Sequence, residues 1–523
     1  MKRRTLAVAL GVCGLLATTF AAAPAAYAED DPPEQWRGYW VDAFNPGVYT
    51  PEQVKKVVSE ASDLNANALV VQTVRRYDCF CNNALYPRTD AAGLDPEPYD
   101  PIAEMIDQAH AAGLEVHAWV NIGTMWNSAT PPSSPDHVFN QHGPDAEGED
   151  RWINKRVDGA EFIGDNVHID PANPGAVDYI VEGVRSVVDA YDVDGINLDY
   201  VRYPDYNASE QYNDWGYSET SLARFHAATG RDDVPAPDDA QWSDWRRDQV
   251  TKLVRKIYLG MYESDPQARL SIDGITYAYG PQTAGSWEQT RPYSQVLQDW
   301  KGWLDEGMID TVVAMNYKRD WMDDQAQMFA EWTEVLADWQ GGRHSVNGTA
   351  LYLNEIDDSL GQVDHTLTPT DAGNTMAGWA GYSYANASLT AAGSTDPDVK
   401  DAERAALAES LAAGPEAPFA EDAAVPEMTW KTEPDVGHVA GTVSLRDGTP
   451  LDQADLTLRP LGGGSSESVA SDGAGWFGFV DVDPGTYLVV LDLPDGVVGA
   501  PVAVVKVKKG QIADASFDNL IEV

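Results

Sequence analysis

Eight short β-rich runs alternate with helical patterns between residues 37 and 384, and no other feature of the sequence constrains the fold as strongly. The runs are residues 37–42, 66–74, 114–121, 193–200, 268–275, 309–318, 344–353 and 377–384. Eight strands with intervening helices over about 350 residues predict an α/β fold of the (β/α)8 barrel type. The alternative, a doubly wound open sheet, normally carries a glycine-rich phosphate loop after its first strand, and "DAFNPGVYT" is not one.

Proline directly after a capping residue marks the start of three expected helices. Thr50-Pro51, Asp100-Pro101 and Asn173-Pro174 each place a side-chain acceptor at the N-cap and proline in the first turn. Further helical patterns cover residues 242–262, 293–306, 324–339 and 398–413. These helices fall between the expected strands, as a barrel requires.

The composition changes after Ala385. A helix ends near Gly414, a Pro/Ala/Glu-rich linker covers residues 415–436, and short strands without helices follow from 437 to 523. Short strands separated by Gly- and Asp-containing turns predict a small all-β sandwich domain. Its sequence, "HVAGTVSLRDGTPLDQADLTL" followed by "SDGAGWFGFVDVDPGTYLVVLDL", resembles the carboxypeptidase regulatory-like, prealbumin-type module, to which we assign no chemistry.

The first 28 residues have the pattern of a secretory signal peptide. A basic start (Lys2, Arg3, Arg4) precedes an apolar stretch, and Ala26-Tyr27-Ala28 supplies the small-x-small cleavage pattern. No second apolar run approaches the roughly 20 residues that span a bilayer. We therefore expect a secreted, extracellular protein, with cell-wall association left open, whose barrel domain covers residues 29–414.

Charge and cysteine content narrow the partners. The chain has 35 Lys and Arg against 83 Asp and Glu, a formal net charge of -48, which argues against nucleic acid or anionic lipid as a partner. Cys79 and Cys81 are close enough in sequence to close a small disulfide in an oxidising compartment. A metal site would need more ligands at suitable spacing, so we expect no metal site.

Polar side chains gather at the C-terminal ends of the expected strands, where a barrel carries its active site. On the fourth strand, Asn197 and Asp199 share one parity while Ile196 and Leu198 share the other, so Asp199 is expected to face the barrel mouth. Strand three repeats this pattern with His117, Trp119 and Asn121. The other strand-end residues are Asp42, Arg75, Asp273, Asn316 and Tyr317.

Each of these residues also has a structural interpretation. Asp199 could form an ion pair with Arg202, His117 could be a satisfied core histidine, and Asp42 and Asp273 could cap the turns that follow them. The tryptophans could all belong to the core. Such a set of polar residues at one barrel face nevertheless favours a functional site.

Aromatic residues near the same strand ends suit a sugar ligand, because an aromatic face stacks on the C–H surface of a pyranose. They are Trp119, Trp126, Trp152, Tyr203, Tyr206, Trp215 and Trp287. Glycoside hydrolysis requires two carboxyl groups, one protonated and one ionised. No serine elbow, Walker loop or HExxH motif indicates another chemistry.

The motifs "RGYWVD", "HAWVN", "HIDPANP" and "VDGINLDYVRYP", taken in order, resemble glycosyl-hydrolase-like family 10, a family of secreted bacterial proteins. The resemblance runs from about Trp36 to about Tyr384. It implies a (β/α)8 barrel and a glycosidase, with bacterial cell-wall glycan as a suggested substrate class. The family's fourth-strand acid falls on Asp199, while Leu198 stands where many members have a second Asp.

Our hypothesis makes Asp199 a principal catalytic carboxylate, held ionised by Arg202 and neighbouring donors. Asp42, Asp273, Asp320 and Glu355 are candidates for the second carboxylate, with Asp273 and Asp42 ranked first. The expected substrate-binding residues are Arg75, His117, Trp119, Asn121, Arg202, Tyr203, Asn316, Tyr317 and Glu355. No cofactor is required, because proton transfer and charge stabilisation suffice.

Two other functions remain open at this stage. One is a non-catalytic carbohydrate-binding protein on the same barrel. The other is a metal-dependent amino-sugar deacetylase or amidase. Loss of activity in the presence of a chelator would favour this second alternative.

Overall fold

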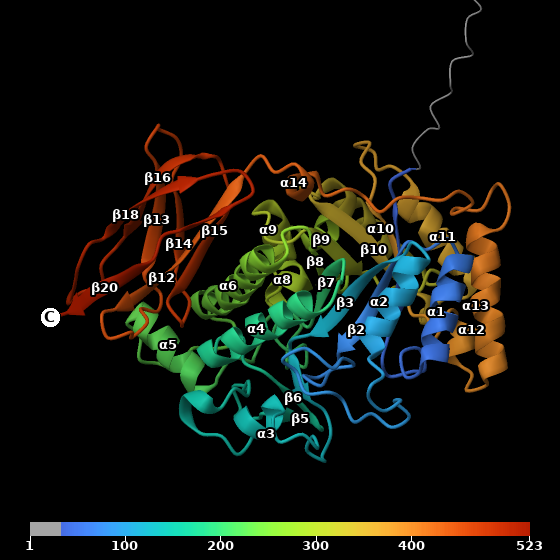
Figure 1. The fold of residues 1–523 in the computed structure, drawn as a ribbon, viewed down its shortest axis with the longest axis horizontal. Coiled ribbons are helices and arrows are strands. Elements are labelled where there is room, and N and C mark those ends of the chain that lie inside the picture. The colour runs from blue at the N-terminus through green and yellow to red at the C-terminus, as the bar shows by residue number, and fades with distance from the viewer. Residues whose placement is uncertain (1–32) are drawn as a thin grey trace, which may run out of the picture. The chain divides into compact units, whose positions relative to one another are not determined.

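A closed barrel of eight parallel strands forms the centre of this computed structural model, which describes residues 33–523. Its strands are β1 (Trp36–Val41), β2 (Ala68–Val74), β3 (Glu115–Asn121), β7 (Gly195–Asp199), β8 (Arg269–Ile275), β9 (Thr311–Met315), β10 (His344–Ala350) and β11 (Gly378–Tyr382). They follow the chain order around the barrel, and β1 pairs with β11 to close it (Figure 1). The predicted (β/α)8 barrel is confirmed. The expected signal peptide lies outside the described residues.

Helices surround the barrel (Figure 1). Those that follow the strands are α1 (Pro51–Asp63), α2 (Pro101–Ala111), α4 (Pro174–Ala190), α6 (Ala240–Ser264), α8 (Arg291–Gln295), α9 (Trp300–Asp305), α10 (Asp323–Asp338), α11 (Ile356–Leu367) and α13 (Pro397–Ala412). Thr50, Asp100 and Asn173 cap α1, α2 and α4 through their side chains, as their sequences predict. Within residues 33–523, no helix combines the length and apolar character needed to cross a bilayer.

Additional helices and strands lie in the loops between the barrel elements and in the segments after β11. The helical ones are α3 (Val138–His142), α5 (Glu219–Thr229), α7 (Pro281–Ala284), α12 (Leu389–Ala392) and α14 (Thr429–Thr432), with 3-10 turns at Gly148–Asp150, Trp287–Gln289 and Leu351–Leu353. Strands β4 (Thr124–Trp126), β5 (Phe162–Ile163) and β6 (Asn166–His168) form a small sheet in the insertion after β3.

The barrel strands bury both faces. Trp36, Trp40, Val70 and Val313 are members of the cluster that fills the interior. On β7, the residues of the other parity, Ile196 and Leu198, join the core beneath the helices. Along each strand, residues that face the helices therefore alternate with residues that face the barrel interior, as the sequence predicts. The interior-facing residues at the C-terminal strand ends are the ones that can line the mouth.

The expected helix over residues 293–306 is interrupted, and this prediction was wrong. Leu297 adopts a left-handed backbone conformation with φ 56°, which ends α8 and separates it from α9. The break lets the buried Gln298 side chain accept a hydrogen bond from the Ile275 N–H (2.7 Å) and donate one to the Asp273 carbonyl (3.1 Å). A residue of the helix layer thus fixes the backbone at the end of β8.

The segment predicted as a linker is packed against the barrel. Phe419 is fully buried, and Ala424 forms a β-bridge with Glu34, just before β1. Further along, Lys431 forms an ion pair of 2.7 Å with Asp310, and both side chains are almost completely buried. Because Asp310 directly precedes β9, this segment lies at the N-terminal end of the barrel.

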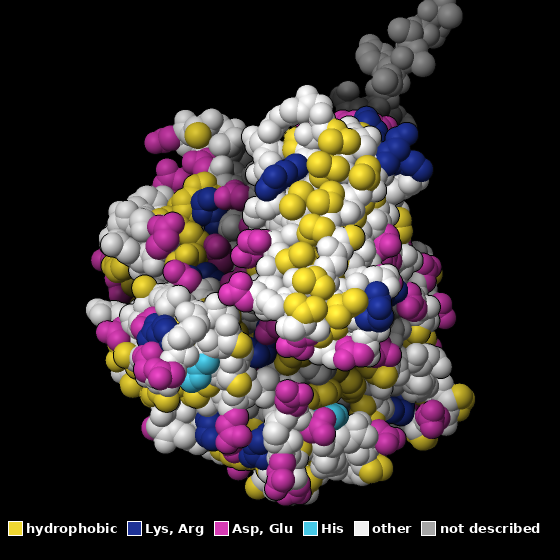
Figure 2. All heavy atoms as spheres, turned by 90° about the vertical axis from the view of Figure 1, so that its left-hand side faces the viewer, with side chains coloured by type: hydrophobic (Ala, Val, Ile, Leu, Met, Phe, Trp, Pro, Cys, Tyr) yellow, Lys and Arg dark blue, Asp and Glu magenta, His cyan; other side chains and the backbone are white. Residues whose placement is uncertain are grey.

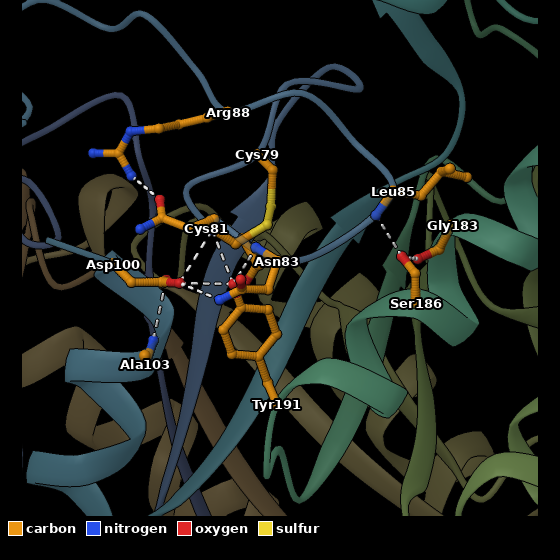
Figure 3. Close-up of a disulfide and its surroundings, with 12 residues drawn as sticks. Cys79, Cys81, Asn83, Leu85, Arg88, Asp100, Ala103, Gly183, Ser186 and Tyr191 are labelled. Atoms are coloured by element: carbon orange, nitrogen blue, oxygen red, sulfur yellow. Dashed lines mark hydrogen bonds between the residues drawn. A yellow bond between two sulfur atoms is a disulfide. The ribbon is translucent and has the colours of Figure 1, made fainter. Parts of the chain in front are cut away.

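A disulfide joins Cys79 and Cys81 in the loop after β2 (Figure 3). The next residues of this loop are held by the Tyr191 hydroxyl, which accepts hydrogen bonds from the Asn82 N–H (2.9 Å) and the Asn83 N–H (2.8 Å). The same hydroxyl donates to the Asp100 carboxylate at 2.8 Å, and Asp100 caps α2. One phenol therefore ties the loop to the helix that follows it.

We expect Tyr191→Phe to lower the free energy of unfolding by about 1 kcal/mol, because the partly buried Asn83 N–H loses its acceptor and the Asp100 carboxylate loses a donor. The Asn82 N–H keeps a hydrogen bond to Asp100 at 3.1 Å. Urea denaturation of the two proteins measures the difference. Tyr487→Phe is a matched control, since its exposed hydroxyl donates to a single carbonyl, that of Asp483. Equal effects of the two substitutions would show that the Tyr191 hydroxyl does not hold the loop.

The C-terminal residues form the predicted β-sandwich. Its strands are β12 (Gly437–Leu445), β13 (Asp455–Pro460), β14 (Glu467–Ala470), β15 (Trp476–Val482), β16 (Gly485–Leu491), β17 (Val497–Val498), β18 (Val502–Val507), β19 (Ile512–Asp514) and β20 (Phe517–Glu522). One sheet has the order β15-β12-β20-β17, with β19 on β12, and the other has the order β14-β13-β16-β18. Phe477, Phe479 and Leu456 are part of the core between them.

Candidate functional site

Asp199 and Asp273 lie side by side at the mouth of the barrel. Asp199 is the last residue of β7, and the register pairs Leu198 with Ile272 on β8, which sets Asp199 and Asp273 at the same height. Neighbouring strands are about 4.8 Å apart, so the two Asp residues occupy adjacent backbone positions, and both side chains point into the barrel interior. Both residues are buried, with 6% and 3% of their surface exposed.

Asp199 is held by two donors. Its Oδ1 accepts the Tyr200 N–H at 2.7 Å, and its Oδ2 accepts the indole N–H of Trp119 at 3.2 Å. Burial raises the pKa of Asp199, while Arg202 and the two donors oppose that shift. Burial outweighs the neighbouring charge, contrary to the expectation that Arg202 sets the ionisation of this group.

Asp273 is the more strongly perturbed acid. Burial and then the nearby Asp199 carboxylate raise its pKa well above the usual range, with Asn197 acting in the opposite direction. Within residues 33–523, Asp273 Oδ1 has no hydrogen-bond partner. Two carboxyl groups so close together in a buried site cannot both ionise easily, and the difference in environment favours the proton on Asp273.

A group of aromatic side chains stands beside the two acids. The Tyr317 and Tyr382 rings stack with centroids 5.5 Å apart, and Trp119 meets Tyr382 edge-on at 6.2 Å. Asp199 and Asp273 both raise the pKa of Tyr382 after burial and Asp42, which places this phenol next to the acids. The sequence interpretation missed Tyr382, although it ends the eighth strand on the parity of Gly378 and Ala380 and could have been found by that alternation.

Arg202 is oriented by groups other than Asp199. Its Nη1 lies 3.6 Å from Asp205 Oδ2, its guanidinium lies over the Tyr200 ring at 4.4 Å, and the Tyr277 hydroxyl donates to Asp205 at 2.6 Å. The alternative in which Asp199 forms a structural ion pair with Arg202 is therefore not the arrangement found. Asp205 and Tyr277 join the site without having been singled out from the sequence.

Asp42 has mainly structural contacts. Its Oδ1 accepts hydrogen bonds from the Phe44 N–H (3.0 Å) and the Asn45 side chain (2.8 Å), and its Oδ2 accepts one from Ser383 (3.3 Å). These contacts close the turn between β1 and α1, which is the capping role weighed for it from sequence. Of the two acids ranked second to Asp199, Asp273 has the environment suited to catalysis.

Three expected substrate contacts are turned away from the mouth. His117 is fully buried near the N-terminal end of the interior, where its ring packs on Trp36 at 4.6 Å and its Nε2 contacts Glu115. Asn316 donates to the Phe329 carbonyl of α10, and Tyr203 is buried beneath the loops beside Arg246. Their positions favour structural roles.

Three more expected contacts lie at or after the C-terminal ends of β3, β2 and β10. Asn121 accepts hydrogen bonds from the Gly123 and Thr124 N–H groups and so shapes the loop after β3. Arg75 forms an ion pair of 2.8 Å with Asp78. Glu355 is exposed and is the N-cap of α11.

Most of the other aromatic residues expected to contact sugar belong to the core. Trp215 and Trp287 are buried, and Trp287 packs on Trp300. Trp152 stacks on His142, whereas Tyr206 is 49% exposed. Position in a loop after a strand did not distinguish packing aromatics from those at the mouth.

No group of three or more His, Cys, Asp or Glu side chains within residues 33–523 is arranged to hold a metal ion.

Comparison with known proteins finds related sequences that match about half of this chain. Glycosyl hydrolase YngK of Bacillus subtilis (strain 168) is 28% identical over 310 residues, 57% of this chain and 54% of YngK. Glycosyl hydrolase DigH of Escherichia coli (strain K12) is 26% identical over 282 residues, 49% of this chain and 53% of DigH. The chain thus spans about half the length of the curated relatives it matches.

Among solved structures, the catalytic domain of β-amylase from Paenibacillus polymyxa is similar with a TM-score of 0.49 and 11% identity, over 72% of this chain and 99% of that domain. The family model described as "Glycosyl hydrolase-like 10" matches residues 35–360, which include β1 to β10 and the two acids. The chain belongs to the glycosyl hydrolase-like 10 family.

Proposed function

We propose that this protein is a secreted glycoside hydrolase that cleaves O-glycosidic bonds of a bacterial cell-wall or extracellular polysaccharide. The observation that carries the proposal is the Asp199–Asp273 pair at the barrel mouth, with Trp119, Tyr317 and Tyr382 beside it. Glycosidases use one protonated and one ionised carboxyl group, and aromatic faces bind pyranose rings. Peptide-free peptidoglycan strands and amino-sugar polymers are the favoured substrates.

The two acids divide the work according to their environments. Asp273, whose pKa is raised furthest, is the general acid that protonates the departing glycosidic oxygen. Asp199, which accepts two hydrogen bonds and lies near Arg202, is the ionised carboxylate that stabilises or attacks the anomeric carbon. No cofactor enters this scheme.

Secretion is part of the same proposal. Its support is the signal-like pattern of the first 28 residues, which ends at Ala28, and the acidic composition of the chain. The partner is then a polysaccharide or oligosaccharide outside the cell, with cell-wall association left open.

Reducing-end release by the wild-type protein and by Asp199→Asn tests the proposal. The substrates are peptide-free peptidoglycan strands, chitin oligomers, galactosaminoglycan and common α- and β-glucans. Activity on one of these that is lost in Asp199→Asn would support a glycosidase and name its substrate. Equal activity in both proteins would remove Asp199 from the chemistry, and affinity without turnover would indicate a carbohydrate-binding protein instead.

We expect Trp119→Phe to move the acidic limb of the kcat/KM profile upward by about one pH unit. The indole N–H stabilises the ionised form of Asp199, so its loss raises the pKa of that carboxyl further. Initial rates between pH 3 and 8 measure the shift. Trp126→Phe is the matched control, because its indole N–H donates to the Thr130 carbonyl, and an equal shift there would contradict the assignment.

A further inference from the structure

Four aliphatic side chains, two of them exposed and two half-buried, form a block on the outer face of the sandwich. In the sheet β14-β13-β16-β18, alternate residues point into the core, and the residues between them face outward. The register sets Leu488 opposite Val504 and Val490 opposite Val502 on this outer face. Val504 is 67% exposed and Val502 is 46% exposed. A sheet face in water normally carries polar side chains at such positions, so this block departs from the usual pattern.

Figure 2 views this end of the molecule and shows hydrophobic side chains gathered in a band over the sandwich, with both basic and acidic side chains at its margins. The block belongs to the sheet whose opposite face lines the sandwich core. The other sheet, through β15 and β12, is the one that packs toward α6 and carries Asp481, which forms an ion pair with Arg343 of the barrel. The outer face of β13, β16 and β18 is therefore a separate surface.

The charged residues of this face are sorted by sign along the strands. Arg459 is paired with Leu488, and Lys506 with Thr486, so the basic residues lie toward one end of the block. Asp455 and Asp492 lie at the other end, where the Asp492 N–H donates to the Asp455 carbonyl. All four charged side chains belong to exposed residues. A rotation that reverses the strand direction therefore brings the basic end of one such face onto the acidic end of another.

We propose that the outer face of β13, β16 and β18 is a self-association surface, where a second copy of this chain packs face to face about a two-fold axis. Two-fold interfaces use the same patch on both partners, and a patch that is basic at one end and acidic at the other is complementary to itself. The outward residues at its centre are aliphatic, whereas sugars stack on aromatic rings, which favours a protein partner over a glycan. The proposal does not depend on the glycosidase function.

The size of the face sets the strength of the interaction. Three strands about 4.8 Å apart and about five residues long cover roughly 15 by 17 Å. This is about 250 Å², roughly a third of the 800 Å² per partner of a standard interface, so the dimer belongs to the weak, transient class of interfaces. The two barrels of such a dimer could bind one polymer chain together, which raises the effective affinity without new contacts in either site.

Sedimentation equilibrium of the purified protein over a wide concentration range tests the proposal. The weight-average mass is expected to rise from monomer toward dimer as concentration increases. A monomer mass at every concentration up to about 1 mM would overturn the proposal, because a dimer with a Kd of about 1 mM or below would be substantially populated there.

Val502→Glu and Val498→Glu form a matched pair, since the two valines are 46% and 45% exposed and only Val502 lies on the proposed face. Val502→Glu is expected to raise the dimer Kd at least tenfold, while Val498→Glu leaves it within about twofold. Thermal unfolding verifies that both variants are folded. Equal weakening by the two substitutions would overturn the assignment of the face.

Charge reversal tests the two-fold alignment. Lys506→Glu is expected to raise the dimer Kd severalfold, and the double variant Lys506→Glu with Asp492→Lys is expected to restore it, because complementarity is regained with the signs exchanged. A double variant weaker than the single one would contradict an alignment of basic on acidic ends.

Discussion

Asp273→Asn is expected to lower kcat on an unactivated glycan by about 10²- to 10⁴-fold, the usual contribution of a general acid. Asn keeps the shape of the side chain but cannot protonate the leaving oxygen. The buried Asp273 carboxyl, beside Asp199, has the raised pKa that a general acid requires near neutral pH. The measurement is initial-rate kinetics on the substrate that the reducing-end screen identifies.

An activated substrate separates the roles of the two acids. An aryl glycoside with a good leaving group needs little protonation, so Asp273→Asn should lose much less activity on it than on the glycan. Asp199→Asn should lose activity on both, because the ionised carboxylate is needed whatever the leaving group. Asp42→Asn should stay within about threefold of wild type, since its carboxylate closes a turn and contacts Ser383. Full activity of Asp273→Asn with loss in Asp42→Asn would exchange their roles.

Asp273→Asn should also raise the stability of the folded protein at neutral pH. An Asp whose pKa is raised in the folded protein binds its proton more tightly there than in the unfolded chain. Its contribution to the free energy of unfolding therefore falls as pH rises through the interval between the unfolded and folded pKa values. Asp273→Asn removes this dependence on pH, so at neutral pH the variant should unfold at a higher temperature than wild type. Replacement of an active-site residue often stabilises a protein in this way.

Lys431→Met is expected to lower the free energy of unfolding by about 3–5 kcal/mol, because it leaves the Asp310 carboxylate buried without its counterion. Lys431 Nζ lies 2.7 Å from Asp310 Oδ2, and only 2% and 0% of the two side chains are exposed. Burial alone would raise the pKa of Asp310, but Lys431, the Leu270 N–H and Trp430 hold it below the usual value. Urea denaturation at pH 7 measures the loss.

Two further variants show whether the ion pair is the cause. Lys431→Met combined with Asp310→Asn should recover most of the stability, because the remaining groups are neutral. Lys509→Met should have no measurable effect, since Lys509 and Asp435 form an exposed ion pair. Because the pKa of Asp310 is depressed, its contribution is present above the unfolded pKa and is lost as pH falls through the folded value. If Lys431→Met is as stable as Lys509→Met, the pair does not stabilise the barrel.

The barrel could be predicted because its signals are local and repeated. Thr50, Asp100 and Asn173 cap their helices as read from the sequence, and alternation on β7 placed Asp199 on the interior parity. Asp273 could be ranked for the same reason, since it lies late in the adjacent strand, two residues before the end of β8. These inferences rest on near-neighbour rules that hold in any strand or helix.

These near-neighbour rules did not predict which charged residue pairs with which, or how deep a side chain lies in the barrel. Arg202 follows Asp199 by three residues, yet it pairs with Asp205, because the Tyr200 ring and the Tyr277 hydroxyl set the loop geometry. His117 shares the parity of Trp119 but lies lower in the barrel, so alternation alone did not show its distance from the mouth. Tertiary contacts from strands far apart in sequence decide such details.

The position of the segment after α13 determines where this protein can be divided. Composition alone suggests removing the sandwich by ending the chain near Gly414. Such a protein would lose Phe419 from its core, the bridge between Ala424 and Glu34, and the counterion of Asp310. The barrel as a folding unit therefore extends to Lys431, and a sandwich-free variant should end just before β12, at about residue 436.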